Sequence, residues 1–155
     1  MLPCVIHVAA RSLATHALSI FGDHQDIYAT RQTGFCMLSS SSVEDAYYMS
    51  IVSHISAIDG SLPFLHFFDG FRTSHELNKV SLVNEGEIRN LIDYNKVYEF
   101  KNRALNLGKE ITRGTSQTGD VYFQNTEIRN TYYDKMILEA STFSKEKIED
   151  LVRDL

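Results

Sequence analysis

The stretch FCMLSSSSVEDAYYMSIVSHISAIDGSLPFLHFFD, residues 35–69, decides the fold. Its two ends, Phe35–Leu38 and Pro63–Asp69, are short apolar runs of the kind that form buried strands. Between them the spacing predicts a helix from Val43 to Gly60, because apolar residues recur at intervals of three or four at Tyr47, Ile51, Ile55 and Ile58. A strand, a helix and a strand in this order indicate a parallel pair with a right-handed crossover, and therefore an α/β fold.

The residues before this stretch predict a third strand. Pro3–Ala10 (PCVIHVAA) is short and apolar, and it ends at Arg11, a charged residue at a strand end. We expect a helical stretch around residues 13–20. The polar segment 21–34 contains two glycines and predicts an extended loop, or a short helix flanked by turns.

Downstream of residue 69 the pattern is weaker. We expect a strand within residues 78–83, helices over 85–93 and 97–105, and a polar loop over 113–120. Residues 121–135 show no sustained period, whereas 144–155 begin with a serine cap and predict a terminal amphipathic helix. Ser41 and Glu44 have the spacing of a capping box for the helix that begins near Val43.

Composition and charge exclude several classes of protein. The chain has 155 residues, 43% of them hydrophobic, so one globular domain with a real core is expected. Its net charge of -5 is unlike that of a nucleic-acid-binding surface. No segment predicts a membrane span or a secretory signal, so we expect a cytoplasmic protein. Two cysteines, Cys4 and Cys36, are too few for a disulfide framework and are expected to be buried thiols.

Four phrases, in order along the chain, resemble one family. They are IHVAAR (6–11), LSIFGDHQDIYATRQTGF (18–35), SLPFLHFFDGFRTSHE (61–76) and RGTSQTGDVYFQ (113–124), and they are similar to the pyruvate:ferredoxin/flavodoxin oxidoreductases. The resemblance covers residues 1–135 as a truncated pyrimidine-binding domain. Residues 136–155 do not resemble the family and are expected to form a divergent helical tail.

The resemblance implies part of a thiamine-diphosphate-binding module of the pyrimidine type, with a mainly parallel sheet flanked by helices. In the complete family enzyme, pyruvate and coenzyme A give acetyl-CoA, carbon dioxide and two electrons, which pass through [4Fe-4S] clusters to ferredoxin or flavodoxin. Thiamine diphosphate, magnesium and the clusters would belong to the assembled enzyme, whose other domains or subunits are the expected partners. The family's thiamine-activating glutamate lies upstream of IHVAAR. We therefore expect no tight cofactor binding, no catalytic residue and no metal ligand in this chain alone.

Arg11 matches the family arginine that binds the pyruvate carboxylate, a role suited to a forked and permanently charged donor. The alternative is that Arg11 pairs with an acid such as Asp23 or caps a helix. The other residues that we single out lie in two loops. Expected to line the thiamine pocket are Asp23, His24, Gln25 and Arg31; expected to form interdomain hydrogen bonds are Asp69, Arg72, His75 and Glu76.

Two further readings stay open. The chain could be a non-catalytic remnant or interaction module derived from the enzyme. An independent hydrolase built on the loops of His24 or His75 has no nucleophile elbow, metal-ligand spacing or phosphate loop to support it. His7, His54 and His66 lie in apolar strands or on a helix face, where a core or surface histidine is ordinary, and no function is assigned to them.

Overall fold

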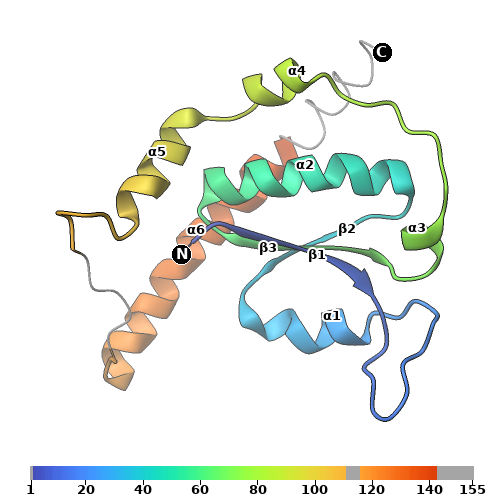
Figure 1. Cartoon of the computed structure of the whole chain (residues 1–155). Coiled ribbons are helices and arrows are strands. Elements are labelled where there is room, and N and C mark those ends of the chain that lie inside the picture. Colours follow the sequence, from blue (N-terminus) through green and yellow to red (C-terminus); the bar gives the residue numbers. More distant parts are fainter. Residues whose placement is uncertain (1, 111–115, 143–155) are drawn as a thin grey trace.

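The computed structural model describes residues 2–110 and 116–142, and its centre is a three-stranded parallel sheet (Figure 1). The strands are β1 (Cys4–Ala10), β2 (Cys36–Ser39) and β3 (Pro63–Asp69), in the spatial order β1-β3-β2. β3 pairs in parallel with both neighbours, and Ala10 is in register with Asp69. The α/β class and the parallel pairing predicted from residues 35–69 are confirmed.

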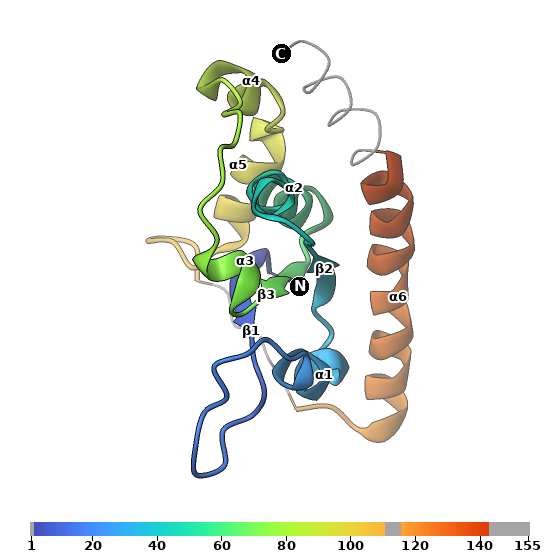
Figure 2. The same cartoon turned by 90° about the vertical axis from the view of Figure 1, so that its right-hand side faces the viewer.

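Helices cover both faces of the sheet. α2 (Val43–Gly60) lies on one face, and α1 (Gln25–Thr30), followed by the 3₁₀ helix η1 (Arg31–Thr33), lies on the other (Figures 1 and 2). Each face has its own apolar cluster. The α2 side contains Ala57, Leu62 and Phe64, and the α1 side contains Ala10, Ile27 and Leu65. Burial of these side chains holds the layers together.

The start of α2 differs from the expected capping box. Ser42, not Ser41, is the N-cap, and its hydroxyl accepts the backbone N–H of Asp45. The Asp45 carboxylate in turn accepts the backbone N–H of Ser41 at 2.8 Å. The cap is therefore displaced by one residue, because Asp45 and not Glu44 reaches back to the chain entering the helix. The helix ends as predicted at Gly60, with Ser61 in the left-handed region at φ 51°.

Two expected elements are absent from the described residues. Residues 13–20 form no helix: Leu18 and Ile20 are 65% and 58% exposed, so no surface packs on an apolar face there. Residues 78–83 form no strand. Their backbone is bonded by tyrosine hydroxyls instead, since Tyr48 donates to Ser81 O and Tyr47 accepts from Val83 N. In contrast, the short helix between turns expected within 21–34 is confirmed as α1 and η1.

The remaining helices are α3 (Arg72–His75), α4 (Glu85–Asn90), α5 (Tyr94–Arg103) and α6 (Gly119–Thr142). α4 and α5 confirm the two helices expected between 85 and 105, with ends shifted by a few residues. α4 has a genuine capping box, formed by Asn84 and Glu87. α6 differs from the prediction, because it includes residues 121–135, which show no sustained helical period in the sequence.

α6 runs along one side of the sheet, beside β2 and α2 (Figure 2). Two of its residues attach it to the body of the protein. Met136 is 4% exposed and packs with Ala57, Leu62 and Phe64, and the Tyr133 hydroxyl donates to Gly34 O at 2.5 Å. Many other residues of α6 are exposed, which explains the weak sequence signal. The predicted terminal helix, residues 144–155, lies outside the described residues.

The two cysteines differ in burial. Cys4 is exposed, so the expectation of a buried thiol is wrong there, because β1 is an edge strand. Cys36 is half-buried, and burial raises the pKa of its thiol. In residues 2–110 and 116–142, every helix is too short or too polar to cross a lipid bilayer.

Candidate functional site

The carboxyl ends of β1 and β3 bring Arg11 and Asp69 to the same edge of the sheet. The pairing of Ala10 with Asp69 fixes this, because Arg11 follows Ala10 directly and Asp69 ends β3. In parallel sheets the loops beyond this edge are the usual place for ligands. The predicted substrate-binding residue and the first residue of the predicted interdomain loop are thus neighbours.

Two glycines allow the side chains at this edge to pack against backbone. At Gly70 a Cβ atom would collide with Ala10 O and with Cδ and Nε of Arg11. At Gly22 it would collide with the carboxylate of Asp69. Arg11 therefore lies over Gly70, Asp69 lies over Gly22, and a larger residue at either position would displace a charged group.

Arg11 is held through its backbone, whereas part of its guanidinium has no partner. Its N–H donates to Asp26 Oδ2 at 3.0 Å, and its carbonyl accepts the N–H of Asp26 at 3.3 Å. The Nε atom is buried and has no hydrogen-bond partner within residues 2–110 and 116–142. Buried guanidinium nitrogens are normally bonded, so Nε is an unsatisfied donor in the described part of the chain.

Asp69 is kept in its charged form. Its Oδ1 accepts the backbone N–H of Phe71 at 2.9 Å and that of Arg72 at 2.5 Å. These two bonds lower the pKa of the Asp69 carboxyl; burial opposes the change, and the charges of Arg72 and Arg11 assist it. Asp69 is thus the carboxylate whose charge interacts with the Arg11 guanidinium, whereas Asp23, the expected alternative partner, accepts the N–H of Gln25.

The residues of the loop before α1 are used largely in local contacts. Asp23 Oδ1 accepts the N–H of Gln25 at 2.9 Å, and Gln25 Oε1 accepts the N–H of Leu13 at 2.8 Å. His24 is the N-cap residue of α1 without a side-chain cap bond, and its exposed ring contacts Phe67 edge-on, with centroids 5.5 Å apart. All three residues are exposed, and the carboxylate of Asp23 and the amide oxygen of Gln25 are used in these local bonds.

Arg31 is not brought together with Arg11. α1 and η1 lead from the carboxyl end of β1 back to the amino end of β2, as a connection between parallel strands must. Arg31 follows α1 directly and is exposed. The two arginines that the sequence placed in one pocket therefore lie at opposite ends of this connection.

The loop after β3 separates its charged residues. Arg72 and Glu76 are exposed at the start and end of α3. The His75 ring contacts Ser74 Oγ at 2.8 Å and stacks at an angle on Phe71, with centroids 5.6 Å apart. Only Asp69 of this group lies beside Arg11, and the others face outward.

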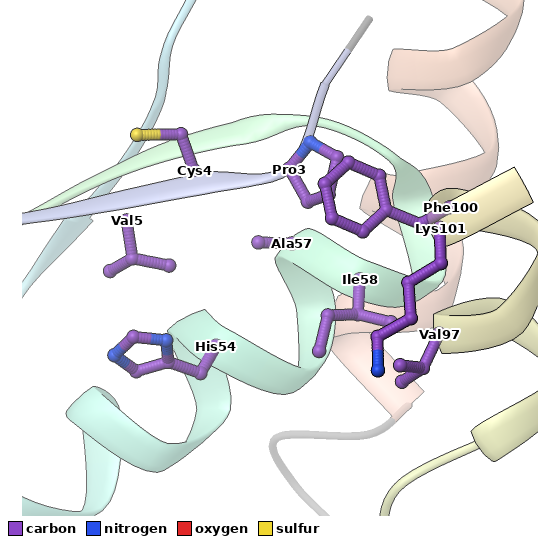
Figure 3. A pocket seen from close by; sticks show the side chains of 9 residues that line it. All are labelled: Pro3, Cys4, Val5, His54, Ala57, Ile58, Val97, Phe100 and Lys101. Carbon is purple, nitrogen blue, oxygen red and sulfur yellow. The ribbon is translucent and has the colours of Figure 1, made fainter. Parts of the chain in front are cut away.

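A separate hollow lies at the opposite, amino end of β1. Figure 3 shows this pocket between β1, α2 and α5, with apolar walls that include Val5, Ile58 and Phe100. Its volume is about 320 Å³, and His54 and Lys101 supply its ring and ammonium nitrogens. Sequence reasoning did not find this pocket, because its walls come from three elements that are distant in the chain.

The described residues contain no cluster of metal-ligating side chains. Within 2–110 and 116–142, no three His, Cys, Asp or Glu side chains are grouped so that they could bind a metal ion. The two cysteines, on β1 and β2, fall short of the four thiolates that a [4Fe-4S] cluster needs. At the carboxyl edge the described charged groups that meet are the Arg11 guanidinium and the Asp69 carboxylate.

Comparison with known proteins gives one family. Residues 1–142 match the family described as pyruvate flavodoxin/ferredoxin oxidoreductase, thiamine diP-bdg, that is, thiamine diphosphate-binding. The chain is similar to the pyruvate:ferredoxin oxidoreductase of Moorella thermoacetica, with 51% identity over 133 residues. It is also 52% identical over 129 residues to a pyruvate-flavodoxin oxidoreductase of Nostoc, and 50% identical over 132 residues to a pyruvate dehydrogenase [NADP(+)] of Cryptosporidium parvum.

The matched segments cover most of this chain but little of each relative. They make up 86% of the chain and 11% of the Moorella protein, 83% and 11% for the Nostoc protein, and 85% and 7% for the Cryptosporidium protein. The sequence resemblance stated from four phrases is therefore confirmed.

Proposed function

Because this chain belongs to the pyruvate flavodoxin/ferredoxin oxidoreductase family, we propose that it forms part of the thiamine-diphosphate-binding domain of a pyruvate-oxidising enzyme and that Arg11 binds the substrate carboxylate. The chain spans 11% of the length of the Moorella relative, so the remainder of the enzyme would supply the chemistry. The complete reaction would convert pyruvate and coenzyme A to acetyl-CoA and carbon dioxide, with two electrons passing to ferredoxin or flavodoxin.

The observation that carries this proposal is the position of the Arg11 guanidinium. It lies over Gly70 at the carboxyl edge, with a buried Nε that has no hydrogen-bond partner in the described residues. A carboxylate accepts two parallel N–H bonds from a guanidinium, so a 2-oxo acid would satisfy this nitrogen and balance its charge. The nearby Asp69 carries one negative charge, and it would disfavour dianionic ligands at the same place.

The cofactors would be bound by other parts of the enzyme. In residues 2–110 and 116–142 no three metal-ligating side chains are grouped, and the two cysteines are fewer than the four thiolates that a [4Fe-4S] cluster needs. The contribution of this chain is then to bind and orient the substrate. His24, with Asp23 and Gln25 supporting its loop, would line the pocket beside Arg11.

We also propose that the exposed groups after β3 contact a neighbouring domain. Arg72, His75 and Glu76 follow the carboxyl edge and are exposed, as interdomain residues would be before a partner covers them. Arg31, at the other end of α1, would contact a different part of the enzyme.

The test is pyruvate-dependent reduction of a viologen dye with thiamine diphosphate, magnesium and coenzyme A. The chain would be assayed alone and after co-expression with the rest of its enzyme. We expect activity only after co-expression. Arg11→Ala should raise the KM for pyruvate by about tenfold or more, and Arg11→Lys should recover part of the loss because it keeps the charge but not the fork.

The matched control is Arg89→Ala, which removes an exposed arginine that pairs with Glu85 on α4. Its KM should equal that of the wild type. An unchanged KM in Arg11→Ala would exclude the proposed carboxylate contact, even if the co-expressed enzyme is active.

A second function is favoured by the exposed apolar side chains. Leu18, Ile20 and Phe21 are 65%, 58% and 67% exposed on the loop beyond β1, as on a surface that binds another polypeptide. In this alternative the chain is a non-catalytic interaction module that binds enzyme chains. This alternative predicts that the chain co-purifies with the enzyme but gives no gain of activity, either alone or after co-expression. That result would favour it over the proposed substrate-binding function.

A further inference from the structure

Three histidines and a serine form a continuous series of contacts across the layers of the fold. Ser40 Oγ lies 2.7 Å from His66 Nε2, and His66 Nδ1 lies 2.8 Å from His7 Nδ1. His7 Nε2 in turn lies 3.2 Å from His54 Nε2. The series joins the end of β2 to the middle of β3, then to β1 and to α2. We call these four residues the histidine chain.

One end of the histidine chain is enclosed and the other is open. His66 is 1% exposed and Ser40 is 6% exposed, whereas His7 and His54 are exposed. Protons from solvent can therefore bind directly to His54 or His7, whereas His66 is shielded from solvent. His54 also lines the apolar pocket at the amino end of β1 (Figure 3).

The proton count of the histidine chain follows from its contacts. With three neutral imidazoles, each contact is satisfied if all donors point in one direction along the chain. One added proton is best placed on His7, because both of its ring nitrogens face an acceptor. His7 then donates to His66 and to His54, and His66 donates its other N–H to Ser40.

A second proton has no such place. On His54 or His66 it would turn an acceptor nitrogen into a donor that faces an N–H of His7, so a hydrogen bond would be replaced by repulsion between two cations. Burial, and then the charge of His7, lower the pKa of both His54 and His66. Other charged or titratable groups lie around the histidine chain. The charge of Asp45 on α2 raises the pKa of His66. Lys101 on α5 and the thiol of Cys4 line the same pocket as His54.

We propose that the histidine chain is a one-proton clamp between β1 and α2. With one proton on His7 the clamp is closed, and uptake of a second proton opens it. Opening loosens α2 from β1, because His7 and His54 form a polar contact between these elements, beside the packing of Val5 against the apolar cluster that contains Ala57. The packing of α2 on β1, a strand at the edge of the sheet, therefore depends on pH.

The test is nuclear magnetic resonance of the full 155-residue chain labelled with ¹⁵N at histidine, followed from neutral to mildly acidic pH. We expect His7 to become protonated on both ring nitrogens while His54 and His66 keep one N–H each. As the second proton binds, amide exchange within residues 43–60, corrected for its intrinsic pH dependence, should increase.

Two variants separate the clamp from three independent histidines. His7→Gln should shift the midpoint of His54 protonation to higher pH, because the repelling charge is removed. If this variant does not fold, His54→Gln can be used instead, because it changes the exposed end of the histidine chain. It should shift the midpoint of His66 protonation to higher pH. His16→Gln, in the exposed loop 13–20, is the matched control and should change neither midpoint.

Independent titration of His7, His54 and His66, with midpoints unaffected by these substitutions, would overturn the proposal. So would protonation of all three histidines without any change of amide exchange in α2.

Discussion

The side chain of Arg11 lies directly against the backbone of Gly70, in space that a Cβ atom at position 70 would occupy. This contact joins the ends of β1 and β3, and it fixes where the guanidinium is presented. The absence of a side chain at residue 70 is thus a condition for this position of Arg11.

Gly70→Ala should displace Arg11 and weaken pyruvate binding. The added methyl group would collide with Ala10 O and Arg11 Nε, so we expect a higher KM for pyruvate in the co-expressed enzyme and a loss of about 1–3 kcal/mol in the free energy of unfolding. Gly119→Ala is the control, because a Cβ there meets nothing within 4 Å. A Gly70→Ala enzyme with normal KM would show that the contact does not position Arg11.

Asp69→Asn should make the free energy of unfolding less dependent on pH under acidic conditions. The pKa of Asp69 lies below its ordinary value of 3.8, mainly because the N–H groups of Phe71 and Arg72 bond the carboxylate. The stabilisation is therefore present above that value and is lost as the pH falls below it. Asparagine can still accept both bonds but does not titrate.

The measurement for this prediction is urea unfolding at several pH values from neutral to strongly acidic. Asp93→Asn is the control, because Asp93 also caps a helix by accepting a backbone N–H, that of Asn95, at 2.9 Å. Equal acid sensitivity in Asp69→Asn and the wild type would contradict the prediction.

The free energy of unfolding should also fall as the pH drops below about 6.5. The pKa values of His54 and His66 lie below their ordinary 6.5, chiefly because burial disfavours the imidazolium. The unfolded chain then binds these protons more readily, so the stabilisation is complete above that pH and declines beneath it. Urea unfolding at pH 7.5 and 5.5, roughly either side of the ordinary value, would measure the difference. It should be smaller in His54→Gln and unchanged in His16→Gln.

Met136→Ala should destabilise the protein by about 2–5 kcal/mol, because it leaves a cavity among Ala57, Leu62 and Phe64. Ile128→Ala on the same helix is the control; Ile128 is 58% exposed, so its loss should be within about 0.5 kcal/mol. Thermal or urea unfolding measures both. Equal effects would mean that α6 is not attached through Met136.

The isolated chain should self-associate through the loop beyond β1. Leu13, Leu18 and Ile20 are all more than half exposed, and they are not covered by the described residues. Replacing the three by serine should lower the apparent mass in light scattering without loss of cooperative unfolding. A wild-type chain that is monomeric at high concentration would contradict this prediction.

The sequence was most informative where local pattern and burial agree. The strands β1, β2 and β3 and the helix α2 follow from short apolar runs and a helical period, and all of them are present. Prediction failed where tertiary contacts replace local signals. Residues 78–83 are bonded by two tyrosine hydroxyls, and α6 is attached by few residues, so neither shows the expected period.

The amino-acid sequence by itself determined the parallel α/β core and the family, and it placed Arg11 at a strand end. Tertiary structure alone decided which acid lies near Arg11, the separation of Arg31 from it, and the histidine chain. His7 and His66 are 59 residues apart in the sequence, and His7 and His54 are 47 apart. Such contacts depend on strand order and register, which no local pattern encodes, because they arise from packing the layers against one another.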